Sequence, residues 1–320
     1  MYSLLLTVLF FQVEFEKQNP IVLEHEAFQF AAVTVLADDL LICNSKDLVI
    51  CRFGKDGTLK NKIGGDGQGD GFQLPHEISW FEDQKRLYVY DGARLDFSIW
   101  ELGGKYQKTI KTDFDIFFKV GPLLSVDQHF VAPVSLVQEE FLVGKFDQEF
   151  KPVKYGYEIA NYNLVDVSPV LQQCFVSQAI VDGSPRILAI QSLASNVDVM
   201  DFDLNLVRSF ILGPVGWKPA DHQILQRVSK NPRELEKYQE QYSEAVCLVA
   251  LEDNLFLVGF RNLLSPRAFT YQVYDGNTGS SIGNSLDLSF TLVGHYKDTL
   301  YFLDPNTQDN MTLTVYGVKH

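Results

Sequence analysis

A glycine-rich segment, residues 64–77, has the clearest spacing for metal chemistry. It reads GGDGQGDGFQLPHE, which from Asp66 onward is D-x-Q-x-D-G-x5-E, the spacing of an EF-hand calcium loop. Oxygen ligands at alternate positions can wrap a calcium ion, and the glycines permit the tight curl. The pattern predicts a calcium site at Asp66, Asp70 and Glu77. The alternative is a turn between two strands, because Gln68 stands where an acidic residue or Asn is usual.

A second group of residues could carry proton transfer or ligand contacts. His76 lies near the start of a predicted strand, and Asp91 and Arg94 lie in a loop that follows the next strand. A histidine beside a carboxylate can act as a general base at neutral pH. The alternative is a solvated histidine next to a turn in which Asp91 and Arg94 interact with each other.

Three more residues, Trp217, Arg261 and Arg267, are candidates for ligand contact. Trp217 precedes a helical stretch and, if exposed, would suit stacking on a sugar or peptide. Its alternative use is to pack that stretch against the rest of the protein. Arg261 and Arg267 border one loop and would present cationic groups beside it.

Motifs for metalloprotease catalysis or structural zinc are missing from the sequence. It contains no H-E-x-x-H, and its six histidines form no i, i+4 pair. Four cysteines form no C-x-x-C pair. Cys43 and Cys51 fall on consecutive predicted strands, where they are either a disulfide or two small buried residues.

A repeat positions all of these residues. A short apolar strand recurs six times and is followed by a second strand that ends in a turn, often Asp-Gly or Gly-Gly. The apolar strands are LLICN, LYVYD, HFVAPV, RILAIQ, LFLVGF and LYFLD, starting at residues 40, 87, 129, 186, 255 and 300. A unit of roughly 45 residues with four short strands has the size of a propeller blade.

The sequence therefore predicts an all-β fold, a six-bladed β-propeller of four-stranded antiparallel blades. The last unit ends with its third strand, so a strand from the N-terminal segment, residues 21–26 or the apolar stretch before them, should close the ring. We place the single propeller domain at 20–320 and leave 1–19 as a truncated signal or an extra strand. Residues 219–244 form a helical insert before the fifth blade, split near Asn231-Pro232.

Blade geometry then gathers the candidate residues at one end of the central channel. The starts of inner strands, the loops between second and third strands and the links between blades all lie on the same face. The segments 64–75, 91–96, 219–244 and 261–267 meet at this mouth, and a loop-rich channel end is a usual binding site. The insert could be a lid over the mouth or could pack on its rim.

Composition limits the partners. With 27 Lys+Arg against 41 Asp+Glu the net charge is −14, so no basic field is available for nucleic acid or an anionic membrane. The 24 Phe and 14 Tyr suit a β-rich core. The apolar stretch at residues 1–11 is too short for an integral membrane segment of about 20 residues, and it lacks the basic start of a signal peptide.

Residues 21–80 and 257–304 resemble the opening and closing blades of the bacterial TolB-like six-bladed β-propellers. Members of that family have a G-x-G-P-G-E-F-type loop, where this chain has Gly67-Gln68-Gly69-Asp70-Gly71-Phe72. The resemblance implies an extracytoplasmic location, in the periplasm or at the cell surface, because members are often exported. It implies no catalytic residue.

Two hypotheses for function follow. The favoured one is a non-catalytic binding module that holds a peptide, glycan or protein partner on the loop-rich face, without a cofactor. The alternative is a metal-dependent, calcium-using hydrolase or lyase at the channel mouth, with His76 as the base.

Overall fold

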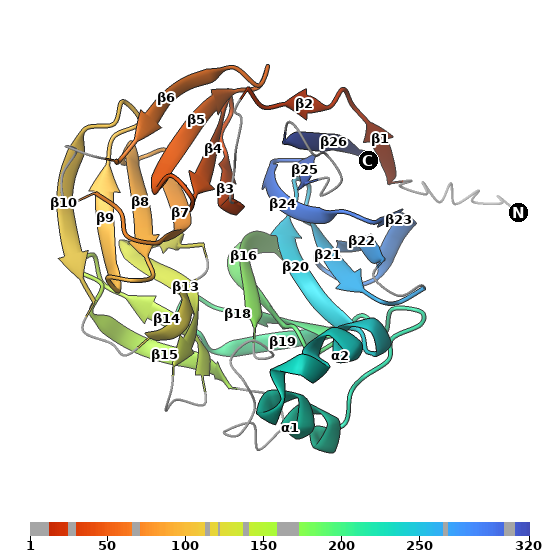
Figure 1. The fold of residues 1–320 in the computed structure, drawn as a ribbon. Helices are drawn as coiled ribbons and strands as arrows, with labels where there is room; N and C mark the ends of the chain where they lie inside the picture. Colours follow the sequence, from red (N-terminus) through yellow and green to blue (C-terminus); the bar gives the residue numbers. More distant parts are fainter. Residues whose placement is uncertain are drawn as a thin grey trace, which may run out of the picture.

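The structure is a computed structural model. It describes residues 13–24, 30–65, 71–112, 116–120, 122–136, 141–158, 173–264, 268–303 and 311–320. Within these residues, six antiparallel sheets are arranged around a central axis, and the chain passes through them in order (Figure 1). The predicted six-bladed β-propeller is confirmed.

The first three blades have these strands, from the axis outward. Blade 1 contains β3 (Phe30–Val35), β4 (Asp39–Asn44), β5 (Val49–Gly54) and β6 (Leu59–Ile63). Blade 2 contains β7 (Pro75–Phe81), β8 (Arg86–Asp91), β9 (Asp96–Trp100) and β10 (Tyr106–Lys111). In blade 3, β11 (Ile116–Val120) and β12 (Leu124–Val126) both pair with β13 (His129–Leu136), followed by β14 (Phe141–Phe146) and β15 (Pro152–Glu158).

The other three blades continue round the ring. Blade 4 contains β16 (Cys174–Val181), β17 (Ser184–Gln191), β18 (Asn196–Met200) and β19 (Leu206–Ile211). Blade 5 contains β20 (Glu244–Ala250), β21 (Leu255–Arg261), β22 (Phe269–Asp275) and β23 (Ser281–Leu288). Blade 6 contains β24 (Thr291–Tyr296), β25 (Thr299–Leu303) and β26 (Thr312–Lys319).

The N-terminal segment supplies the outer edge of blade 6. Strand β1 (Glu14–Lys17) pairs with β26 from Lys319 to Tyr316, and β2 (Ile21–Val22) pairs with its beginning. Residue 20, the predicted start of the propeller, thus lies between the two strands that close the ring.

Successive side chains of a strand point to opposite sides of the sheet, which explains why strands in the middle of a blade are apolar throughout. In β4, Leu40 and Ile42 pack toward blade 6, whereas Leu41 and Cys43 pack toward blade 2. Both sides of the strand are therefore buried between neighbouring blades. Six such clusters of buried residues lie between adjacent blades within the described residues. The outer strands face solvent on one side, and β23 alternates between exposed and half-buried residues.

The same alternation separates two cysteines that the sequence placed on facing strands. Cys43 is paired in register with Ile50, and Cys51 with Ile42, so the two thiols pack in different inter-blade clusters. Both are free thiols in the structure. Burial raises the pKa of Cys51 to about 11, so the thiol stays protonated at neutral pH.

Candidate functional site

Blade geometry brings the predicted residues of blade 2 to one end of the sheet, as expected. Pro75 at the start of β7 is in register with Asp91 at the end of β8, which is in register with Asp96 at the start of β9. The helical insert connects β19 to β20 on the same face of the ring, which we call the insert face. Arg267, Asp66 and Asp70 lie outside the described residues.

Asp91 holds backbone rather than facing a ligand. Its side chain is buried and accepts hydrogen bonds from four backbone N–H groups at 2.7 to 3.2 Å. Two donors, Gln73 and Leu74, belong to the link that enters blade 2, and the others, Ala93 and Arg94, belong to the loop after β8. The carboxylate therefore ties the two segments together.

Arg94 is engaged inside the protein as well. Its guanidinium forms an ion pair with Asp96 at 3.0 Å and donates to the carbonyl oxygen of Gly71 at 3.0 Å. Burial raises the pKa of Asp96 despite the opposing effect of Arg94. The predicted turn interaction between Asp91 and Arg94 is present through the Arg94 backbone N–H, whereas the Arg94 guanidinium pairs with Asp96.

The end of the second strand carries a similar polar tether in other blades. Gln191 at the end of β17 donates from Nε2 to the carbonyl oxygen of Glu158, the last residue of β15. Asn262, just after β21, donates from Nδ2 to the carbonyl oxygens of Gln239 and Tyr242 in the insert. In blades 2, 4 and 5, a polar residue at or just after the end of the second strand therefore binds the backbone of the segment that leads into its blade.

Arg261 and Trp217 also have internal contacts. Arg261 is paired across the strands with Glu244, the first residue of β20, and forms an ion pair with its carboxylate. Burial lowers the pKa of Arg261. The Trp217 ring packs edge-on against Phe260, with 5.8 Å between ring centroids. Trp217 therefore packs the segment before the insert against blade 5.

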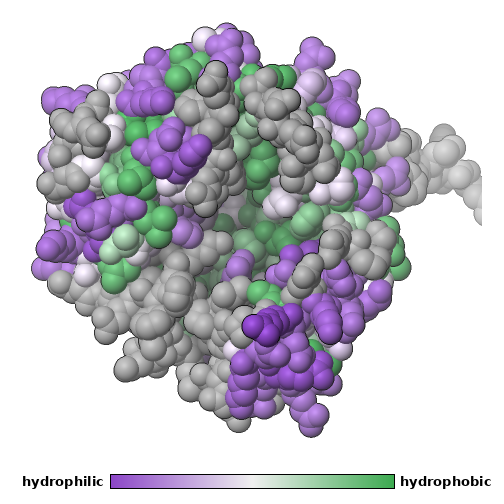
Figure 2. Space-filling model, viewed as in Figure 1, coloured by the Kyte–Doolittle hydropathy of each residue, from purple (hydrophilic) through white to green (hydrophobic). Residues whose placement is uncertain are grey.

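The insert consists of α1 (His222–Lys230), the short 3₁₀ helix η3 (Pro232–Glu234) and α2 (Leu235–Gln241), and it splits at Asn231-Pro232 as predicted. Asp221 caps α1 by accepting from the Ile224 N–H at 2.9 Å. Leu225, Val228 and Tyr238 form a small core of their own that also contacts Leu193 of blade 4. In Figure 2 the outer surface of the insert is strongly hydrophilic. The contact with Leu193 attaches the insert to the rim of the ring at blade 4.

His76 and Glu77 are both half-buried at the start of β7. Glu77 accepts from the Ile78 N–H at 3.3 Å. Among the residues that the structure describes, no group of three His, Cys, Asp or Glu side chains could hold a metal ion. Calcium binding by Asp66, Asp70 and Glu77 stays a prediction.

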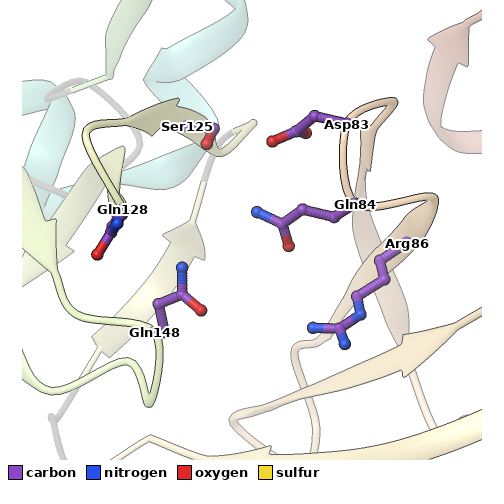
Figure 3. Close-up of a pocket in the computed structure, with 6 residues that line it drawn as sticks. All are labelled: Asp83, Gln84, Arg86, Ser125, Gln128 and Gln148. Carbon is purple, nitrogen blue, oxygen red and sulfur yellow. The ribbon is translucent and has the colours of Figure 1, made fainter.

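A polar pocket of about 540 Å³ lies on the face opposite the insert, between blades 2 and 3. One wall comes from the turn before β8 and the other from the turns before β13 and β15. Figure 3 shows side chains of the two walls facing each other across the pocket. The lining residues are Asp83, Gln84, Arg86, Ser125, Gln128 and Gln148. None of these residues was predicted from the sequence, because all the predicted residues belong to segments of the insert face. The only sequence signal for the pocket is glutamine in turns.

A second cavity of about 420 Å³ lies on that opposite face as well, where blade 6 meets blade 1. Its lining includes Lys55 and Tyr301, and Lys55 donates a hydrogen bond to the Tyr301 hydroxyl at 2.6 Å. Among the described residues, none of those predicted to bind a ligand lines either cavity.

One histidine outside these sites makes stability depend on pH. Burial lowers the pKa of His295, in β24, from 6.5 to about 4. The unfolded chain therefore takes up a proton as pH falls through this window while the folded protein does not, so stability is lost. Between pH 7.5 and pH 5 we expect wild type to lose about 2 kcal/mol more than His295→Gln. Urea unfolding at both pH values measures this, and equal losses would contradict it.

Comparisons with known proteins agree with this architecture. A DUF4221 family member from Bacteroides vulgatus ATCC 8482 is similar over 97% of this chain and 99% of its own, with a TM-score of 0.72 and 11% identity. The fold is shared. A protein of Bacteroides fragilis NCTC 9343 that is predicted to be exported is similar over 96% of each chain, with a TM-score of 0.66 and 14% identity. No family model and no curated protein matches the chain.

Proposed function

We propose that this propeller is a non-catalytic binding module that holds a glycan through the polar pocket between blades 2 and 3. The convergence of three carboxamides on that pocket from two blades carries the proposal (Figure 3). Each carboxamide both donates and accepts hydrogen bonds, which matches the hydroxyl groups of a sugar. The remaining lining groups, Asp83, Arg86 and Ser125, add further donors and acceptors.

The predicted residues on the insert face are engaged within the protein, and this favours the opposite face as the binding surface. Asp91, Arg94 and Arg261 are held by backbone or ion-pair partners, and binding a ligand through them would break those contacts. Asp83, Gln128 and Gln148 in the pocket are exposed, and the other lining residues are half-buried. Gln84 accepts a hydrogen bond from the Tyr88 hydroxyl at 3.1 Å, and its amide N–H groups remain as donors. A peptide is the competing ligand, since its backbone offers the same hydrogen-bonding groups.

The experiment screens the full chain on a glycan array and an extended-peptide array, and measures the hits by calorimetry. Gln84→Ala/Gln128→Ala/Gln148→Ala should weaken glycan binding by about tenfold or more, because each of the three lost hydrogen bonds contributes about 0.5–1.5 kcal/mol. The matched control is Gln223→Ala/Gln241→Ala on the insert, which should bind like wild type. If only the control variant loses glycan binding, the site lies on the loop-rich insert face instead. If only peptides bind, the ligand is a peptide and not a glycan.

We further propose an extracytoplasmic location and a relationship to the TolB-like propellers. The resemblance of residues 21–80 and 257–304, and the fold shared with a protein that is predicted to be exported, support both. No helix of the described residues is long and apolar enough to cross a membrane. Fractionation of cells that express the full chain tests the location, and recovery only with the cytoplasm would contradict it.

A further inference from the structure

The seam between the last and first blades contains a cavity built from three separate parts of the chain. Blade 1 contributes Lys55, in the turn after β5, and blade 6 contributes Tyr296 and Tyr301. The link between β1 and β2 contributes Gln18 and Asn19. A ligand in this cavity would contact both ends of the chain as well as the first blade.

The ammonium group of Lys55 is held over aromatic rings without a counter-ion. Its Nζ lies 4.4 Å from the centroid of the Tyr301 ring and 5.8 Å from that of Tyr296. Within the part of the chain that the structure describes, no carboxylate lies at ion-pair distance from Lys55. Asp39 is occupied by Arg52 at 2.6 Å and by Lys60 at 2.5 Å. A half-buried ammonium that lacks an anion favours a ligand that brings one.

The Tyr301 hydroxyl provides a second donor next to the ammonium. Its oxygen accepts from Lys55 Nζ at 2.6 Å, so its own proton is available for another acceptor. Burial raises the pKa of Tyr301, which keeps the phenol protonated at neutral pH. Two adjacent donors, one of them charged, match the two oxygens of a carboxylate. The amides of Gln18 and Asn19 line the same cavity and offer further donors.

We propose that this cavity binds a small organic carboxylate, whose two oxygens accept hydrogen bonds from Lys55 and Tyr301. The apolar side chains of Ile21 and Val315 line the cavity and would contact the body of the ligand. Because the protein carries a net charge of −14, its overall field repels anions, and recognition depends on these local donors. Binding also connects the N-terminal segment to blades 1 and 6 and so stabilises the closed ring.

The pH dependence of binding follows from the charge of Lys55. Burial lowers the pKa of Lys55 to about 8, although Asp39 and Asp38 act in the opposite direction. The other titratable groups that face Lys55 are the phenols of Tyr296 and Tyr301. Above pH 8 the free protein must take up a proton to bind a carboxylate, so affinity should fall about fivefold between pH 8 and pH 9.

The experiment measures thermal shift and calorimetry of the full chain with benzoate, succinate and acetate at pH 7. Benzamide is the neutral match for benzoate, and inorganic phosphate tests a different anion. At least one carboxylate should bind saturably and raise the melting temperature. Lys55→Met should weaken that binding by tenfold or more, and Tyr301→Phe by a smaller factor. Lys62→Met, an exposed lysine on β6 of the same blade, should bind like wild type.

A second measurement probes Lys55 directly. Trace acetic anhydride at pH 7.5, followed by mass spectrometry, should label Lys55 faster than exposed lysines, and a bound carboxylate should protect it. The proposal is overturned if no carboxylate binds, if benzamide or phosphate binds as well as benzoate, or if Lys55→Met binds like wild type. The glycan pocket between blades 2 and 3 is a separate site, so neither result depends on the other.

Discussion

Arg261→Met is expected to destabilise the propeller by about 3–5 kcal/mol, because it leaves the carboxylate of Glu244 buried without its partner. The Arg261 and Glu244 side chains are 19% and 8% exposed, and both lie at the ends of facing strands in blade 5. Urea unfolding followed by fluorescence measures the change. A ligand-binding role for Arg261 would instead leave the free energy of unfolding unchanged.

The matched control removes both charges. Glu244→Leu combined with Arg261→Met should cost clearly less than Arg261→Met alone, because no unpaired charge remains in the blade. If the double variant is as unstable as the sum of the two single variants, the two side chains do not interact, and the ion pair is not what holds this end of blade 5.

Asp91→Ala should cost about 4 kcal/mol, since four backbone N–H groups lose a charged acceptor in a buried position. Asp91→Asn keeps one acceptor oxygen and should cost about half as much. The loss should appear in urea unfolding, and proteolysis should become faster at the link before β7 because that link loses its tether.

Asp147 provides the comparison for Asp91. It also accepts from two backbone N–H groups, Glu149 and Lys151, but in an exposed turn of blade 3. Water can replace the carboxylate there, so Asp147→Ala should cost about 1 kcal/mol. Equal losses for the two alanine variants would show that burial at Asp91 does not matter.

The repeat predicted the fold because propeller blades are built from local sequence. Strand β4 and its five equivalents are short, apolar and followed by turns, and each packs between two neighbours. The insert was visible from its helical period and its Asn231-Pro232 break. The closing strand was expected from residues 21–26 or from the apolar stretch before them. In the structure, β2 and β1 both pair with β26, which is long enough to hold the two.

The candidate site was harder to predict because residue type does not show which partner a side chain has. The sequence placed Asp91 and Arg94 on one face correctly. Whether they meet a ligand or the protein's own backbone depends on the link before β7, which folds against them. The exposure of Trp217 likewise depends on Phe260, 43 positions later in the sequence.

The blade count, the antiparallel sheets and the place of the insert follow from the sequence alone, because short apolar strands, helical periodicity and turn residues are local signals. The positions at which polar side chains gather in cavities depend on the tertiary structure. Both cavities lie at seams between blades, and their walls come from chain that is distant in sequence, as with Lys55 and Tyr301. Ring closure creates such neighbours, and no local pattern encodes them.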